Sequence, residues 1–133
     1  MLNNTLYRLL HDKRLTVGYL GGSITEGTGA SNPELCWRGR ITQWLRNSFP
    51  DCDITEVNAA IGGTGSNLGI YRMDEDLLSG SPDLVFVEFT VNDASYTFDE
   101  ILSDSETIVR KIYEKDPTTE IIYVHTATKF VSN

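Results

Sequence analysis

The 133-residue sequence contains no apolar run long enough to span a bilayer, which takes about 20 consecutive apolar residues. Its N-terminal residues also lack the apolar stretch and small-residue cleavage site of a secretory signal, so we expect a cytoplasmic protein. Basic residues are few: 11 Lys and Arg stand against 19 Asp and Glu, a formal net charge of −8. Nucleic acids and anionic membranes attract basic surfaces, so the charge argues against both as partners.

Residues that bind metals or form disulfides are equally scarce. The two cysteines, Cys36 and Cys52, have no metal-ligand neighbours at short spacing, and we interpret them as free thiols. A disulfide between them stays open, because a sequence alone does not exclude one. The two histidines, His11 and His125, are too far apart to form a local metal motif. We therefore expect no metal and no organic cofactor.

Four apolar, β-branched runs alternate with amphipathic segments, and no repeat or linker separates them. The runs predict strands at residues 15–20, 54–61, 84–89 and 121–126. Helical spacing occurs in residues 1–14, 36–50, 66–80 and 103–117. The last two strands are nearly continuous apolar runs, which is typical of strands covered on both faces. This order predicts one α/β domain over residues 1–133: a three-layer sandwich whose parallel strands are joined by right-handed crossovers.

The helical spacing also predicts which side chains share a helix face. These sets are Trp37, Ile41, Trp44 and Leu45; Leu68, Tyr71 and Leu77; and Ile108, Val109, Ile112 and Tyr113. We expect the helix that carries the last set to begin at a cap among Ser103, Asp104 and Ser105.

Polar, glycine-containing segments follow three of the predicted strands: 21–25, 62–66 and 90–93. The carboxyl ends of parallel strands meet at one rim of the sheet, and ligands of open α/β sheets bind there. Each segment alone has a structural explanation as a glycine turn, a helix cap or an Asx turn. Together they favour a functional site, because chance would distribute such residues over both rims.

Three blocks of the sequence resemble the SGNH (GDSL-type) hydrolase family, in the family's order. They are Gly22-Ser23, Asn58-Ala-Ala-Ile-Gly62-Gly63 and Val91-Asn92-Asp93. The phrases GGSIT and PDLVFVEFTVND are similar to a branch with esterases that act on acylated carbohydrates. The resemblance extends from about Thr16 to the end of the chain. It implies a flavodoxin-like sheet with the strand order 2-1-3-4 and a serine esterase for acyl, or acetyl, groups on a sugar.

The resemblance implies a role for three residues. Ser23 matches the nucleophile, and its backbone N–H, the N–H of Gly63 and the side-chain amide of Asn92 match the three oxyanion donors. A serine hydroxyl attacks an ester only when a base takes its proton, and the charge formed on the carbonyl oxygen needs preorganised donors. Thr90 replaces the glycine of the family pattern, which changes the local turn but leaves Asn92 in place.

The family's base is a histidine in an Asp-x-x-His segment, and neither histidine of this sequence matches it. We place His11 on the surface and His125 inside the fourth strand, bonded to backbone; a substitute base is the alternative for His125. We therefore expect the N-terminal portion of such a hydrolase, with its fifth strand position empty and little or no turnover. The edge strand at 121–126 would then be covered by a second copy or another segment.

Four polar residues near the predicted rim also need an explanation. Arg72 is either a solvated helical arginine, a clamp on Glu88 or Asp93, or a contact for a substrate carboxylate. Glu88 lies within an apolar strand and needs a basic or hydroxyl partner. We expect Asp93 to accept backbone hydrogen bonds and Glu26 to cap the turn after the nucleophile.

Two other functions stay open. A non-catalytic domain would bind a phosphate or nucleotide through backbone N–H groups at 21–23 and 62–66. Against it, neither of the common glycine-rich nucleotide motifs is present. An acyltransferase would use the same serine as the esterase.

Overall fold

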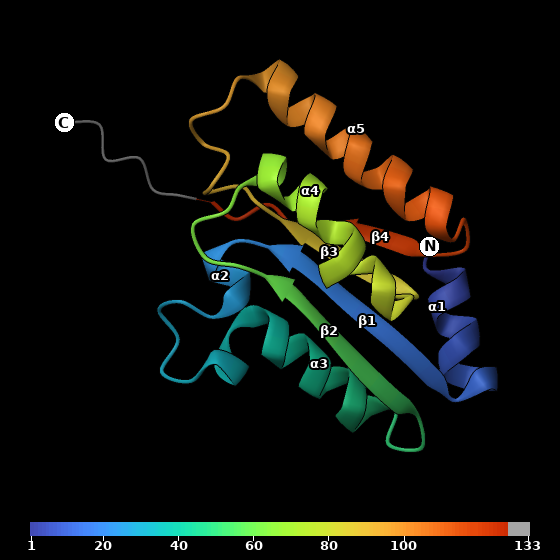
Figure 1. Ribbon diagram of the computed structural model, residues 1–133. Coiled ribbons are helices and arrows are strands. Elements are labelled where there is room, and N and C mark those ends of the chain that lie inside the picture. Colours follow the sequence, from blue (N-terminus) through green and yellow to red (C-terminus); the bar gives the residue numbers. More distant parts are fainter. Residues whose placement is uncertain (128–133) are drawn as a thin grey trace.

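Four parallel strands form the central sheet of the computed structural model, which describes residues 1–127. The strands are β1 (Arg14–Gly21), β2 (Asp53–Ala60), β3 (Leu84–Glu88) and β4 (Glu120–Tyr123). Their order, β2-β1-β3-β4, is the predicted one (Figure 1). At the carboxyl end of β1, Gly21 lies opposite Ala60 of β2 and Glu88 of β3. The first three strands therefore end level with one another, and their exits meet at one rim.

Helices cover both faces of this sheet. They are α1 (Asn3–Tyr7), the π-helical η1 (Arg8–Asp12), α2 (Ser23–Glu26), η2 (Pro33–Leu35), α3 (Trp37–Ser48), α4 (Ser66–Asp76), η3 (Leu78–Gly80) and α5 (Phe98–Lys115). Figure 1 shows α3 on one face of the sheet and α4 and α5 on the other. This is the predicted three-layer α/β fold.

Side chains from β1 alternate between the two layers of the core, as the period of a strand requires. Leu20 packs with Met73 and Ile108 on the side of α4 and α5. Its neighbour Tyr19 packs with Leu45 of α3 on the opposite side. The sheet is thus covered on both faces, which explains the continuous apolar runs in the sequence.

Helix α5 begins earlier than the sequence analysis predicts. Its cap is Thr97, whose hydroxyl accepts from the N–H of Glu100 while the Glu100 carboxylate accepts from the N–H of Thr97. This reciprocal capping box satisfies two backbone donors at once, so the helix starts at Phe98. The predicted cap among Ser103, Asp104 and Ser105 was wrong, because all three residues lie inside the helix.

Some helix faces were also predicted wrongly. Trp44, Tyr71 and Tyr113 are 61%, 84% and 46% exposed. In α4 the buried face runs through Gly69, where an added Cβ would lie 2.7 Å from Cζ of Phe89. The helix approaches the sheet through this glycine, with Met73 buried on the same face and Tyr71 turned toward solvent.

Strand β4 is shorter than predicted, and His125 follows it instead of lying inside it. The N–H of Val124 still donates to the carbonyl of Val87, but Thr126 then turns its hydroxyl to the carboxylate of Glu88. Within residues 1–127, β4 pairs with β3 alone. A second copy or another segment along its outer edge stays a prediction.

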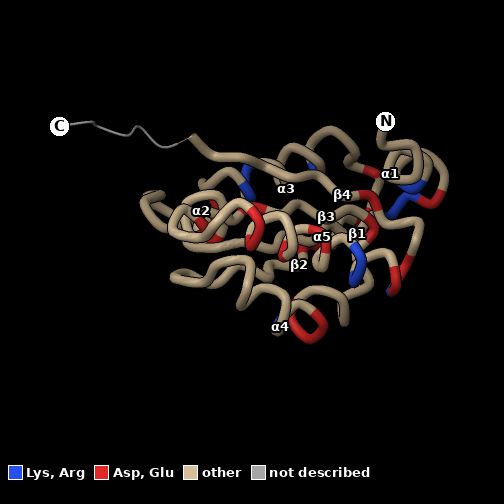
Figure 2. The backbone as a smooth tube through the Cα atoms, turned by 90° about the horizontal axis from the view of Figure 1, so that it is seen from above, with Lys and Arg blue, Asp and Glu red and all other residues tan. Residues whose placement is uncertain are grey.

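Both cysteines are free thiols, as predicted. No helix within the described residues has the length and apolar character needed to cross a membrane. The same residues contain no group of three His, Cys, Asp or Glu side chains placed to share a metal ion. Figure 2 shows acidic and basic residues intermixed near α1 and an acidic stretch on α4.

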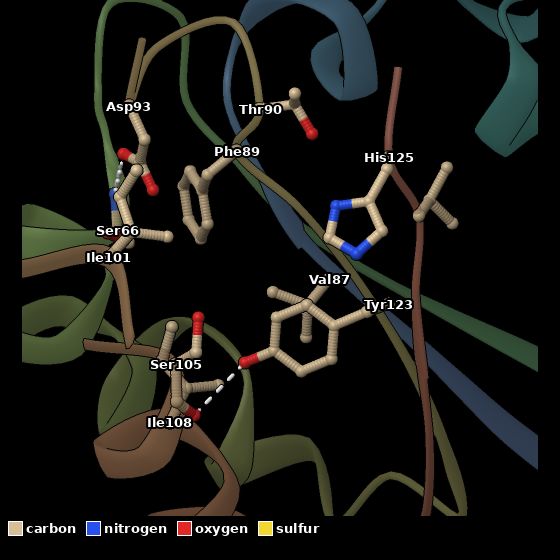
Figure 3. A pocket seen from close by; sticks show the side chains of 11 residues that line it. Ser66, Val87, Phe89, Thr90, Asp93, Ile101, Ser105, Ile108, Tyr123 and His125 are labelled. Atoms are coloured by element: carbon tan, nitrogen blue, oxygen red, sulfur yellow. Dashed lines mark hydrogen bonds between the residues drawn. The ribbon is translucent and has the colours of Figure 1, made fainter. Parts of the chain in front are cut away.

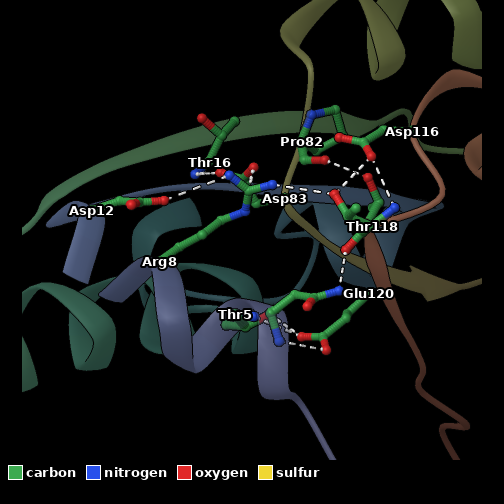
Figure 4. A network of polar contacts seen from close by, with 11 residues as sticks. Thr5, Arg8, Asp12, Thr16, Pro82, Asp83, Asp116, Thr118 and Glu120 are labelled. Carbon is green, nitrogen blue, oxygen red and sulfur yellow. Dashed lines mark hydrogen bonds and ion pairs between the residues drawn. The ribbon is translucent and has the colours of Figure 1, made fainter. Parts of the chain in front are cut away.

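A network of polar contacts ties α1 to the edge of the sheet (Figure 4). The carboxylate of Glu120 accepts from the backbone N–H groups of Asn4 and Thr5 and from the Thr5 hydroxyl, at 2.9, 2.8 and 2.6 Å. A negative charge at the first turn of a helix also interacts favourably with its dipole. The carboxylate of Glu120 thus holds α1 to β4, beside the contact of the Asn4 amide with the carbonyl of Thr118.

We expect α1 to detach first on acidification. Burial raises the pKa of Glu120, but the hydrogen bonds from Thr5 and Asn4 lower it more, so the net pKa lies below its ordinary value of 4.5. The stabilisation is complete above that ordinary pKa and is lost as the pH falls through the lower, folded-state pKa. Amide shifts of Asn4 and Thr5 in an NMR titration measure this. In Glu120→Gln the side chain does not titrate, so a wild-type profile identical to that of the variant would contradict the prediction.

Candidate active site

The exits of β1 and β3 meet at the first turn of α2, where Ser23 lies. Gly22 precedes Ser23, and an added Cβ there would lie 2.2 Å from Oδ1 of Asn92 and 3.1 Å from the carbonyl oxygen of Thr64. Contacts this short are not tolerated, so the Asn92 side chain approaches the serine turn because residue 22 has no side chain. The structure thus brings Ser23 and Asn92 together.

The exit of β2 reaches the same serine. An added Cβ at Gly62 would lie 3.7 Å from Cβ of Ser23. Gly63 follows with φ +76°, a left-handed conformation that glycine adopts readily, and nothing lies within 4 Å of the position of its absent Cβ. The backbone of Gly63 is therefore open to an approaching ligand.

The three expected oxyanion donors are all unoccupied. Within residues 1–127, the N–H groups of Ser23 and Gly63 and the side-chain amide of Asn92 make no hydrogen bond to the protein. Gly63 is exposed and Ser23 and Asn92 are half-buried, so these three donors lie near the protein surface. Their free state leaves them available to a ligand oxygen or to water.

Two charged side chains fix the loop that carries Gly63. The carboxylate of Glu26 accepts from the N–H of Gly62 at 2.8 Å. The guanidinium of Arg72 donates to the carbonyl of Gly21 at 3.0 Å, to the Thr64 hydroxyl at 3.1 Å and to the carbonyl of Ala59. Arg72 is neither solvated nor a clamp on Glu88 or Asp93, so both of these interpretations were wrong.

The sequence held a partial signal for these roles. Glu26 lies three residues after Ser23, so both side chains lie on one side of a helical turn. A contact to the next strand's exit was therefore foreseeable. The contacts of Arg72 to the strand ends had no such signal, because two of its partners there are backbone carbonyls, which every residue offers.

Glu88, the last residue of β3, connects three strand exits next to the serine turn. It is 2% exposed, and its carboxylate accepts from the Thr25 hydroxyl at 3.2 Å, the Thr90 N–H at 3.0 Å and the Thr126 hydroxyl at 3.0 Å. The expected hydroxyl partner is thus confirmed. Three donors offset the cost of burying the carboxylate and hold the exits of β1, β3 and β4 together.

Asp93 lies at the rim, whereas His11 lies in the helical segment that precedes β1. Asp93 accepts from the N–H of Ser66 at 2.8 Å, which confirms its expected role as a brace. His11 is exposed and stacks on Tyr7 in the N-terminal helical segment. His125 lines a cavity on the side of α4 and α5 (Figure 3). Neither histidine hydrogen-bonds to Ser23 within the described residues.

A three-layer α/β fold with a serine at the exit of β1, and with glycine and asparagine at the next two exits, is the arrangement of SGNH ester hydrolases. The chain belongs to the GDSL-like Lipase/Acylhydrolase family, whose model matches residues 19–132. The resemblance seen in the sequence is thereby confirmed. No curated protein sequence matches the chain.

Solved structures agree with this assignment. A two-domain esterase active on acetylated mannans, co-crystallised with mannopentaose, is 38% identical with a TM-score of 0.81; the match covers 91% of this chain and 33% of that one. A lipase/acylhydrolase from Enterococcus faecalis is 23% identical (TM-score 0.66; 82% and 55% covered). An acetyl xylan esterase variant from Geobacillus stearothermophilus is 21% identical (TM-score 0.57; 82% and 58% covered). The last two show the fold alone, and the chain spans about a third of the first esterase.

Proposed function

We propose that the chain carries the nucleophile and oxyanion hole of an esterase that removes acetyl groups from carbohydrate. The observation that carries the proposal is the convergence of three free donors, from Ser23, Gly63 and Asn92, at the exits of three level strands. The substrate class is supported by the 38% identity to an esterase that acts on acetylated mannans. The formal net charge of −8 also argues against nucleic acid as the substrate, because nucleic acids attract basic surfaces.

The proposed reaction has two steps. Ser23 Oγ attacks the ester carbonyl, and the negative charge on the carbonyl oxygen is received by the N–H groups of Ser23 and Gly63 and by the amide of Asn92. The sugar leaves as an alcohol, and water then releases acetate from the acyl-enzyme. Glu26 and Arg72 hold the Gly63 loop in place before substrate arrives, and donors fixed in advance need no reorganisation during the reaction.

The first step needs a base for the serine proton. Within residues 1–127, Ser23 Oγ makes no hydrogen bond to a histidine or carboxylate. A serine without its base loses most of its catalytic advantage, so we expect this chain to hydrolyse p-nitrophenyl acetate slowly. Turnover typical of an intact esterase, lost in Ser23→Ala, would contradict this expectation.

A fluorophosphonate probe tests the proposal directly. Intact-mass and peptide mass spectrometry should find one phosphonyl group, on Ser23, and none on Ser23→Ala. Added imidazole should accelerate the labelling, because it supplies the base that the serine lacks. The proposal fails if Ser23 stays unlabelled with imidazole present, or if other serines react equally fast.

A further inference from the structure

A cavity of about 210 Å³ lies between α5, the start of α4 and the ends of β3 and β4 (Figure 3). Its apolar walls include Val87, Phe89 and Ile108, and the ring of Tyr123 closes one side. Burial raises the pKa of Tyr123 to about 12, and its hydroxyl donates to the carbonyl of Ser105 at 3.1 Å. The hydrogen bond to Ser105 therefore holds the ring of Tyr123 in place as one wall of the cavity.

Several polar groups of the cavity have unused hydrogen-bonding capacity. Asp93 is 5% exposed, and one of its carboxylate oxygens accepts from Ser66 while the other has no partner within residues 1–127. The hydroxyls of Thr90 and Ser105 and the ring of His125 also make no hydrogen bond there. Figure 3 shows these side chains arranged around one space. The second carboxylate oxygen of Asp93 is not among the buried polar atoms without a partner, so it is accessible to a donor from water or a ligand.

The charge and shape of the cavity restrict its ligand. No Lys or Arg lines it, and Asp93 supplies a negative charge, so anionic ligands are disfavoured. Its volume is below the roughly 300–1,000 Å³ of pockets for drug-sized ligands, which favours a single small ring. A pyranose offers a C–H face to the rings of Phe89 and Tyr123 and hydroxyl donors to Asp93 and His125.

The cavity adjoins the candidate active site. Thr90 and Asp93, which line it, lie on either side of Asn92 in the same loop. We propose that this cavity is a sugar subsite, which takes one neutral pyranose ring of the carbohydrate whose ester reaches Ser23. This assignment rests on the proposed function for its substrate, but sugar binding itself needs no reaction at the serine.

NMR titration of the full ¹⁵N-labelled chain with unacetylated mannopentaose tests the subsite. We expect saturable shifts of Thr90, Asp93, Ser105 and His125, with a Kd on the order of 1 mM or tighter. Ser105→Leu fills the cavity with an apolar side chain and should weaken binding at least about tenfold. The matched control is Ser103→Leu, two residues along α5 and outside the cavity, which should bind like the wild type.

A second arm separates neutral from anionic sugars. Methyl glucoside should shift the same residues, whereas glucuronate should bind more weakly because its carboxylate meets Asp93. Absence of saturable shifts with mannopentaose, shifts confined to other surfaces, or wild-type binding by Ser105→Leu would overturn the proposal. Ser23→Ala should retain sugar binding, because binding needs no reaction at the serine. If the wild type binds sugar but its Ser23 is not phosphonylated, the esterase proposal is rejected and the subsite proposal is kept. Phosphonylation without sugar binding would reject the subsite alone.

Discussion

Replacing Asn92 with alanine is expected to slow phosphonylation of Ser23 about 100- to 1,000-fold, the loss typical of one oxyanion donor. The amide of Asn92 lies against Gly22, next to the nucleophile, and makes no hydrogen bond within residues 1–127. Its removal therefore takes a donor from the developing oxyanion without breaking a contact that holds the fold. The rate of labelling in the presence of imidazole measures the effect.

The thermal unfolding midpoint separates this effect from a loss of structure. It should change little in Asn92→Ala, because no hydrogen bond of the described protein is lost. Asn47→Ala, at an exposed position of α3, provides the matched control and should label like the wild type. Equal labelling rates for Asn92→Ala and Asn47→Ala would show that Asn92 is not an oxyanion donor.

Replacing Glu56 with alanine should lower the free energy of unfolding by about 3–5 kcal/mol, the cost of leaving a buried charge without its partner. Arg38 is 2% exposed and pairs with Glu56, and it donates to the carbonyl of Thr25 at 3.1 Å. Burial lowers the pKa of Arg38, but the hydrogen bond and charge of Glu56 raise it further, so the guanidinium stays charged. Urea unfolding followed by tryptophan fluorescence measures the change.

The same arginine offers an internal control. Glu34 lies 3.6 Å from Arg38 on the other side but is 67% exposed, so Glu34→Ala should cost no more than about 1 kcal/mol. In the double variant Arg38→Met/Glu56→Leu, much of the lost stability should return, because no unpaired charge stays buried. If Glu34→Ala and Glu56→Ala unfold at the same urea concentration, the buried pair does not have the proposed importance.

The fold was predictable because its main signals are local. Apolar runs mark the strands and the handedness of crossovers constrains their connections, while the family resemblance supplied the order β2-β1-β3-β4. The convergence of Ser23, Gly63 and Asn92 follows from that order, since parallel strands bring their exits to one rim. The start of α5 was missed although its signal was present, because the pair Thr97 and Glu100 competes with several other candidate caps.

Other features depend on contacts that no sequence window contains. The exposure of Tyr71 results from the close approach of Gly69 to Phe89 on another element. Arg72 finds its partners on the ends of two strands that only the folded sheet places together. The cavity beside Asp93 likewise exists only once α5 has packed over β3 and β4.

The carboxylate of Glu88 accepts hydrogen bonds from Thr25, Thr90 and Thr126, close to the turn of the nucleophile. These threonines belong to segments that follow β1, β3 and β4, so one carboxylate fixes the chain after β4 relative to the turn that carries Ser23.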